Sequence, residues 1–273
     1  MKTAIVTGSN TGIGRATATE LARRGMRVIL ACRDLDRAAA VADGIRRDTR
    51  SPEVEAMHLD LASLASVARF ADRFLSLDLP LDVLVNNAGV AGQRGVTRDG
   101  FEIHFGVNHL GHFKLTALLV PALERAAPAR VVNVASKAHY DARSLELDDV
   151  MGTTRTFTGL REYERSKLAN VLFTRSLAKR LDPRRVAVHA LHPGVVASDA
   201  WRRIPWPVRW WMTRDMLSNE DGAKTSIYCA TAEALAGESG LYYDACSVKA
   251  PSALAQDDAL AERLFTFSEE RTC

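Results

Sequence analysis

The sequence predicts a single α/β domain in which helices cover both faces of a doubly wound, mostly parallel seven-stranded sheet. Short apolar segments rich in valine, isoleucine and leucine alternate with longer amphipathic segments, and no change in composition marks a linker. The chain has 273 residues, 47% of them hydrophobic, which suffices for one large core without disulfides or metals. We therefore expect right-handed crossovers between neighbouring parallel strands.

Each expected element follows from its hydrophobic period. We expect strands at residues 3–6, 27–31, 54–58, 83–85, 130–134, 186–191 and 241–243. We expect helices at residues 14–24, 35–47, 64–75, 100–124 and 162–180. The last helix has one apolar face, formed by Leu168, Val171, Leu172, Leu177 and Leu181.

Composition excludes several classes of protein. The net charge is only +3 and the basic residues are spread along the chain, which argues against nucleic-acid binding. The four cysteines form no CxxC pair, so we expect a reducing compartment with neither disulfides nor a zinc site. Apolar runs are too short for a signal peptide or a membrane span. We expect a cytoplasmic protein without stable membrane insertion.

A glycine-rich turn joins the first strand to the first helix. It reads Gly8, Ser9, Asn10, Thr11, Gly12, Ile13, Gly14. Glycines let the backbone turn tightly and approach a pyrophosphate, whose charge is met by the helix N-terminus. Such a turn alone could be a tight loop, but its place between strand and helix predicts a dinucleotide site.

The end of the second strand indicates which dinucleotide. An acidic residue there binds the ribose 2′-hydroxyl and repels a 2′-phosphate, whereas this chain has Cys32 followed by Arg33. A guanidinium suits a phosphate, so the sequence predicts NADP(H). In the alternative interpretation Arg33 is a solvated charge and Asp34 takes the hydroxyl.

Further short motifs follow the expected strands in order. They are Asp60-Leu61, Asn86-Asn87-Ala88-Gly89, Asn108, Ser136, the pair Tyr163 and Lys167, and Pro193-Gly194. Together with the glycine turn, this ordered set resembles the short-chain dehydrogenase/reductase family, within it the retinol-dehydrogenase-like branch. The resemblance covers essentially the whole chain and implies a Rossmann fold with a nicotinamide cofactor.

The resemblance also implies roles for individual residues. Lys167 is expected to hold the nicotinamide ribose, and Asn108 a water of a proton relay behind Lys167. Ser198 stands where many members have a threonine that contacts the cofactor. The expected cofactor-binding set is Gly8, Ser9, Asn10, Thr11, Gly12, Ile13, Gly14, Arg33, Asp60, Leu61, Asn87, Ala88, Gly89, Tyr163, Lys167, Pro193, Gly194, Val196 and Ser198.

Carbonyl reduction explains why these residue types are needed. A hydride reaches the carbon while a proton reaches the oxygen, and Tyr163 is the expected general acid/base. On a helix, a spacing of four puts Lys167 on the same face, where its ammonium favours the phenolate. Ser136 is expected to hydrogen-bond the substrate oxygen. The alternative is an exposed helical tyrosine beside a solvated lysine.

Two features depart from the broad family pattern. About two dozen residues separate Ser136 from Tyr163, roughly twice the usual gap, and we expect them to form a loop beside the active site. Ala135 stands where a second serine is frequent, which matters little if Ser136 is the catalytic one.

All four tryptophans follow the Pro193-Gly194 turn. Trp201, Trp206, Trp210 and Trp211 fall within residues 199–220, where we expect a lid over a bulky, lipophilic substrate. Core packing, an oligomer contact and a membrane contact are the alternatives.

Three histidines, His104, His109 and His112, could suggest a metal site. No cysteine or carboxylate cluster accompanies them, so we expect packing or surface histidines and no metal.

These observations favour an NADP(H)-dependent oxidoreductase acting on a lipophilic alcohol or carbonyl compound. The alternatives on the same fold are a C=C reductase, a redox-neutral epimerase and a non-catalytic NADP(H) sensor. A homo-oligomer, dimer or tetramer, is an expectation from the resemblance alone.

Overall fold

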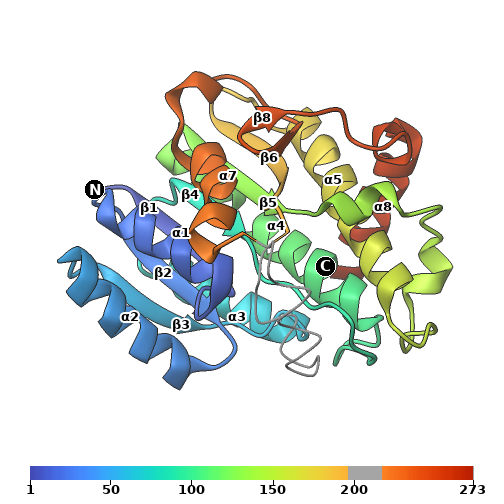
Figure 1. The fold of residues 1–273 in the computed structure, drawn as a ribbon, viewed down its shortest axis with the longest axis horizontal. Helices are drawn as coiled ribbons and strands as arrows, with labels where there is room; N and C mark the ends of the chain where they lie inside the picture. The colour runs from blue at the N-terminus through green and yellow to red at the C-terminus, as the bar shows by residue number, and fades with distance from the viewer. Residues whose placement is uncertain (196–216, 273) are drawn as a thin grey trace.

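An eight-stranded sheet runs through the middle of the computed structural model, which describes residues 1–195 and 217–272 (Figure 1). The first seven strands are parallel and confirm the seven expected ones, with several ends extended by a residue. They are β1 (Thr3–Thr7), β2 (Arg27–Cys32), β3 (Val54–His58), β4 (Val83–Asn86), β5 (Ala129–Val134), β6 (Val186–His192) and β7 (Leu241–Asp244).

The eighth strand, β8 (Ser247–Val248), pairs antiparallel with β7 and was not predicted. The two residues of its hairpin loop, Ala245 and Cys246, both have positive φ, as type I′ turns require. Neither is the glycine or asparagine that normally signals such a turn, so a two-residue strand left no pattern to detect.

Strand order places the functional edge of the sheet. The order is β3-β2-β1-β4-β5-β6-β7-β8, so the winding reverses between β1 and β4. In open parallel sheets, ligands bind at the carboxyl ends of the strands beside this reversal. Every motif of the expected site follows β1, β2, β3, β4, β5 or β6, and therefore meets at this edge.

Helices cover both faces of the sheet (Figure 1). On one face, α1 (Gly12–Arg23) and α2 (Leu35–Thr49) pack over β1, β2 and β3, and α7 (Asn219–Thr231) packs beside α1 over β4, β5 and β6. On the other lie α3 (Leu64–Leu75), α4 (Gly111–Ala126), α5 (Leu160–Arg180) and α8 (Asp258–Thr272). Within residues 1–195 and 217–272, no helix combines the length and apolarity needed to cross a membrane.

Three helical features differ from expectation. α7 and α8 were not predicted; the buried side of α7 consists of small residues such as Gly222, Ala223 and Ala230, which give a weak apolar period. The helix expected at 100–124 begins later, because Phe101 and Glu102 pair with Met151 and Val96 in isolated bridges. Its first part, η1 (Phe105–Leu110), is a π-helical turn, a form that often marks functional sites.

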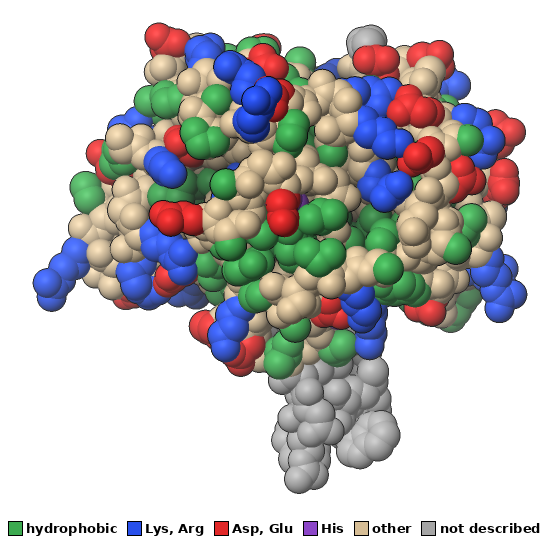
Figure 2. Space-filling model, turned by 90° about the horizontal axis from the view of Figure 1, so that it is seen from above, with side chains coloured by type: hydrophobic (Ala, Val, Ile, Leu, Met, Phe, Trp, Pro, Cys, Tyr) green, Lys and Arg blue, Asp and Glu red, His purple; other side chains and the backbone are tan. Residues whose placement is uncertain are grey.

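Charged side chains do not segregate by sign on the face shown in Figure 2. Lysine and arginine alternate with aspartate and glutamate around its rim, while hydrophobic side chains gather toward its middle. This face therefore carries no basic stripe of the kind that binds nucleic acid.

Several histidines are buried in the core. Burial lowers the pKa of His109 to about 3, and the pKa values of His112, His189 and His192 to about 4. An unfolded chain would protonate these rings near pH 6.5. Between those values the unfolded state binds more protons than the folded state, so stability falls as pH falls.

We predict that the melting temperature decreases progressively from about pH 6.5 toward pH 4. In His189→Leu, unfolding should take up about one proton fewer over this range, which flattens the decrease. Thermal unfolding followed by circular dichroism across the pH series measures this. The exposed His58→Leu serves as the control, and an equal slope in wild type and His189→Leu would contradict the explanation.

Candidate active site

The turn after β1 packs closely against the turn after β4 only because its glycines lack side chains. A Cβ on Gly8, whose φ is +64°, would lie 2.9 Å from the Cα of Ala88. A Cβ on Gly14 would lie 2.4 Å from Nδ2 of Asn87 and 2.6 Å from the carbonyl oxygen of Gly8. The backbone of this turn therefore lies directly against the turn after β4. Such a cradle at the N-terminus of α1 fits the pyrophosphate of a dinucleotide.

The side-chain hydroxyl of Thr7 joins the turn after β1 to the turn after β4. Oγ1 of Thr7 accepts hydrogen bonds from the amides of Asn87 and Ala88, both at 2.9 Å, and lies 2.9 Å from Nε2 of His112. Because both lone pairs of the hydroxyl are used, its proton is donated to His112. Nδ1 of His112 then donates to the carbonyl oxygen of Asn108 at 3.0 Å. Thr7 and His112 thus connect the cofactor cradle to the segment that carries Asn108.

The side chain of Asn108 holds the neighbouring loops in place. Its Oδ1 accepts from the amide of Val90 at 2.7 Å, and its Nδ2 donates to the Val90 carbonyl at 3.0 Å and to Oγ of Ser166 at 2.9 Å. A Cβ on Gly89 would lie 3.3 Å from Oδ1 of Asn108. Asn108 therefore fixes the loop after β4 against α5, and its expected role in a water relay stays a prediction.

Tyr163 and Lys167 lie one turn apart on α5, as their spacing predicts. The Nζ of Lys167 lies 5.7 Å from the centroid of the Tyr163 ring and donates to the carbonyl oxygen of Val134 at 2.9 Å. Burial lowers the pKa of Lys167 to about 8. Burial also raises the pKa of Tyr163, and a hydrogen bond with Ser136 partly offsets this. Loss of solvent around Tyr163 therefore outweighs the expected lowering of its pKa.

Ser136 lies two residues beyond β5 and caps the short helix η2 (Lys137–Tyr140). Its Oγ accepts from the amide of Ala138 at 3.2 Å, and its carbonyl oxygen lies 2.7 Å from Nδ1 of His139. His139 is fully buried, and its Nε2 accepts from the amide of Ser252 at 3.1 Å. Ser136, Tyr163 and Lys167 thus converge beyond the carboxyl end of β5.

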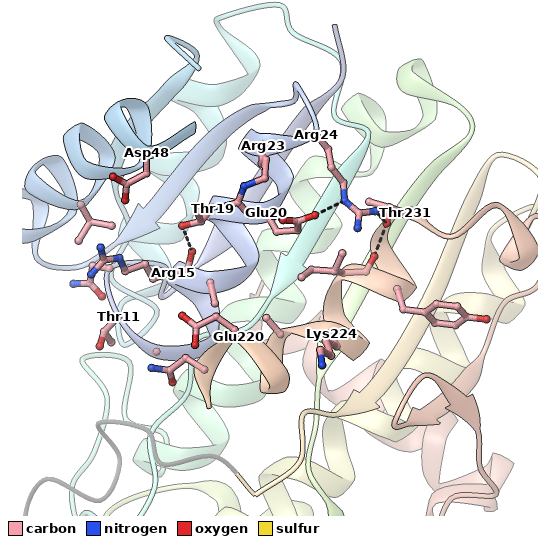
Figure 3. A pocket seen from close by; sticks show the side chains of 18 of the residues that line it. Thr11, Arg15, Thr19, Glu20, Arg23, Arg24, Asp48, Glu220, Lys224 and Thr231 are labelled. Carbon is pink, nitrogen blue, oxygen red and sulfur yellow. Dashed lines mark hydrogen bonds and ion pairs between the residues drawn. The ribbon is translucent and has the colours of Figure 1, made fainter. Parts of the chain in front are cut away.

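Basic side chains lie at the opposite end of the cradle. Arg33 is exposed directly after β2, and Asp34 caps α2, accepting the amide of Arg37 at 3.0 Å. A groove beginning at Thr11 is also lined by Arg15 and Arg37, which sequence reasoning missed although Arg15 directly follows the last glycine of the turn. In Figure 3, Arg15 and Thr11 lie together at one end of this groove.

Other expected cofactor residues have structural contacts. Oγ of Ser9 donates to the Val6 carbonyl at 2.8 Å. The Asp60 carboxylate accepts the Ala62 amide at 3.1 Å, and the Leu61 carbonyl lies 2.7 Å from where a Cβ on Gly111 would stand. These contacts order the loop after β3 beside the cradle.

The segment expected to cover the substrate leaves β6 at Gly194 and returns at Leu217, just before α7. Gly194 has a φ of +85°, and the amide of Leu217 donates to the carbonyl of Val195 at 2.9 Å. Val196, Ser198, the four tryptophans Trp201, Trp206, Trp210 and Trp211, and residues 199–216 of the expected lid lie outside the described residues.

The three histidines considered as metal ligands have separate partners. His104 pairs with Glu102, His109 with Ser268, and His112 with Thr7. All three are buried and pack within the helix that begins before η1. All three are therefore packing histidines, and His104 and His112 also lie beside the site.

A fold of this kind with a Ser-Tyr-Lys arrangement defines a class of nicotinamide-dependent oxidoreductases, and comparison with known proteins agrees. The family model described as short chain dehydrogenase matches residues 2–146. The chain belongs to this family of oxidoreductases, which act on CH–OH groups and bind a nicotinamide cofactor.

Particular relatives refine this placement. Human retinol dehydrogenase 13 is 45% identical, over 98% of this chain and 83% of its own length. Among solved structures, an uncharacterised protein from Mycobacterium Paratuberculosis has a TM-score of 0.79 at 34% identity, covering 100% of this chain and 93% of that one. The Pseudomonas aeruginosa RhlG/NADP active-site complex has a TM-score of 0.70 at 28% identity, covering 88% and 93%. The chain is thus a retinol-dehydrogenase-like member of the family.

We predict that Thr7→Val destabilises the protein by about 1–2 kcal/mol, because the half-buried amide of Ala88 loses its acceptor and that of Asn87 keeps only the carbonyl of Val85. The affinity for NADPH should fall about tenfold, because the turn that packs on the cradle loses its anchor. Urea unfolding and NADPH fluorescence measure the two effects. Thr49→Val, at the half-buried end of α2 and away from the cradle, is the matched control. Wild-type stability and affinity in Thr7→Val would show that the junction is dispensable.

Proposed function

We propose that this protein uses NADP(H) to interconvert a lipophilic alcohol and its carbonyl compound. The observation that carries the proposal is the convergence of Ser136, Tyr163 and Lys167 beyond β5, beside a glycine cradle suited to a dinucleotide. None of these side chains is expected to bind a metal, and acid–base chemistry with hydride transfer needs none.

The geometry suggests how each side chain contributes. A bound nicotinamide supplies or accepts the hydride. Ser136 donates a hydrogen bond to the substrate oxygen and keeps it beside the phenol. In reduction, Tyr163 gives its proton to that oxygen; in oxidation, its phenolate takes the proton from the alcohol. The Lys167 ammonium, held by the Val134 carbonyl, stabilises the phenolate.

The preference for NADP(H) rests on the charges around the nucleotide end. Arg33 follows β2, Arg37 lies in the first turn of α2, and Arg15 lies in the first turn of α1. A phosphate bound between these elements would meet guanidinium groups. One carboxylate oxygen of Asp34 is engaged in capping α2, which argues against its use for a ribose hydroxyl. The similar RhlG structure is an NADP complex, which agrees with this preference.

A lipophilic substrate is supported by apolar side chains beside the N-terminus of α5. Met151, Phe157 and Leu160 are 40%, 89% and 55% exposed, which is unusual for large apolar residues in neighbouring turns. A retinol dehydrogenase among the relatives agrees with such a substrate.

We further propose that the protein is a homo-oligomer in the cytoplasm. The three described cysteines are all free, which suits a reducing compartment.

We predict that Tyr163→Phe reduces NADPH-dependent turnover of hydrophobic ketones and aldehydes by about 10²–10⁴-fold, because the proton donor is lost. NADPH affinity should stay within about threefold, because the phenyl ring remains in place. The loss of NADPH absorbance measures turnover, and Tyr228→Phe on α7 is the control. Wild-type turnover in Tyr163→Phe would refute the acid–base role.

The same assay separates the alternative functions. Consumption of NADPH only with conjugated enones would indicate a C=C reductase, and conversion without net NADPH loss would indicate an epimerase. NADPH binding without conversion of any compound would indicate a sensor.

We predict that Arg33→Glu weakens NADPH binding about 10- to 100-fold and leaves NADH binding unchanged or stronger, because a carboxylate repels the 2′-phosphate and accepts a ribose hydroxyl. Fluorescence titration with both nucleotides measures this. Arg47→Glu makes the same charge change on the exposed last turn of α2 and should not alter the preference. An unchanged ratio in Arg33→Glu would contradict the assignment.

A further inference from the structure

A buried carboxylate–imidazole pair lies beside the catalytic tyrosine and has no part in the mechanism above. Glu102 and His104 are 2% and 0% exposed. One oxygen of Glu102 accepts the main-chain amides of His104 and Phe105, at 2.8 and 3.0 Å, and so caps the helix that leads into η1. The other oxygen lies 2.8 Å from Nδ1 of His104.

The carboxylate determines which nitrogen of His104 carries the proton. A carboxylate only accepts, so Nδ1 of His104 donates to it. Within residues 1–195 and 217–272, Nε2 has no hydrogen-bond partner. A buried polar nitrogen without a partner is costly, which indicates that the ring is held there for its position rather than for a second hydrogen bond.

The outer edge of the imidazole faces the start of α5. A Cβ on Gly159 would lie 2.7 Å from Cε1 and 3.4 Å from Nε2 of His104, so only glycine allows this approach. The carbonyl of Gly159 accepts the amide of Tyr163 at 3.0 Å, in the first turn of α5. The rings of His104 and Tyr163 meet edge to face, with centroids 6.3 Å apart and planes at 75°.

The same carboxylate also holds the long segment between Ser136 and Tyr163. Oγ1 of Thr154 donates to Oε1 of Glu102 at 2.6 Å and accepts the amide of Gly95 at 3.1 Å. Three segments therefore meet at Glu102 and His104: the helix that carries Asn108, the inserted loop, and the first turn of α5.

We propose that Glu102 and His104 are positioning residues for Tyr163, which orient its ring and keep water away from its phenol. Glu102 holds the imidazole at Nδ1, and the imidazole supports the Tyr163 ring and the Gly159 turn. The inference rests on the proposed acid–base role of Tyr163. It predicts that the imidazole ring, rather than its hydrogen bond to Glu102 alone, affects the titration of Tyr163.

Two substitutions separate the ring from its hydrogen bond. In His104→Asn, the amide nitrogen takes the place of Nδ1 and still donates to Glu102, but the ring beside Tyr163 is lost. In His104→Phe, a ring remains, but Glu102 loses one of its four donors. His109→Asn is the matched control, because His109 is equally buried in η1 and bonds Ser268 instead.

The first measurement is the phenol titration of Tyr163, taken as the difference in near-ultraviolet absorbance between each protein and its Tyr163→Phe counterpart, with and without NADP⁺. In His104→Asn, water reaches the phenol and the pKa of Tyr163 should fall by about half a unit or more. In His104→Phe, the titration should stay within about 0.2 unit of wild type while the melting temperature falls. In His109→Asn, the melting temperature should fall without a change in titration.

The second measurement is kinetic. The kcat of His104→Asn should fall about tenfold, with KM for NADPH within about twofold of wild type, because ring orientation affects the proton-transfer step and not cofactor binding. In the oxidation direction, the rising limb of its pH–rate profile should move to lower pH in step with the titration, because oxidation requires the Tyr163 phenolate.

The outcomes distinguish this inference from the proposed function. A wild-type titration and kcat in His104→Asn would show that the pair only caps a helix, and the inference would fail. Full activity in Tyr163→Phe would instead refute the acid–base role. A shifted titration in a protein without turnover would support the positioning and overturn the proposed reaction.

Discussion

The site depends on a constraint at the centre of the sheet, where the winding reverses between β1 and β4. Two turns must approach closely enough to cradle a ligand, and the half-buried amides of Asn87 and Ala88 at their junction are both directed at Thr7. The hydroxyl of Thr7 accepts a hydrogen bond from each amide and donates one to His112, whose other ring nitrogen donates to the carbonyl of Asn108. The hydrogen bonds of the Thr7 hydroxyl therefore join the glycine turn after β1, the turn after β4 and the helix that carries Asn108.

Exclusion of water is the second organising effect. Lys167 is buried and Tyr163 is largely removed from solvent, so the charged forms of both are disfavoured: the lysine pKa falls to about 8 and the tyrosine pKa rises. When Tyr163 loses its proton, the phenolate is stabilised by the Lys167 ammonium, and this attraction is stronger because the site holds little water. Glu102 and His104 extend this dry surrounding to the far side of the phenol ring.

Local sequence patterns predicted most of the fold and the principal site residues. The seven parallel strands were found because buried strands are continuous apolar runs. The spacing of four correctly placed Tyr163 and Lys167 one turn apart on a helix, whereas their catalytic roles came from the family resemblance. α7 was missed because small and polar residues form its buried side. β8 was missed because a strand of two residues is too short to show the alternation of apolar and polar residues. Arg15 and Arg37 were missed because their shared groove exists only once α1 and α2 pack.

The sequence by itself determined the class of fold, the order of the motifs and the type of chemistry, because each follows from residues near one another in the chain. Only the tertiary structure decided which distant groups share a hydrogen bond: Thr7 with His112, Asn108 with Val90, and Thr154 with Glu102. It also decided the direction in which the pKa of Tyr163 is shifted, since desolvation depends on what packs around a side chain. Burial and long-range pairing arise from the packed chain as a whole, and no local period encodes them.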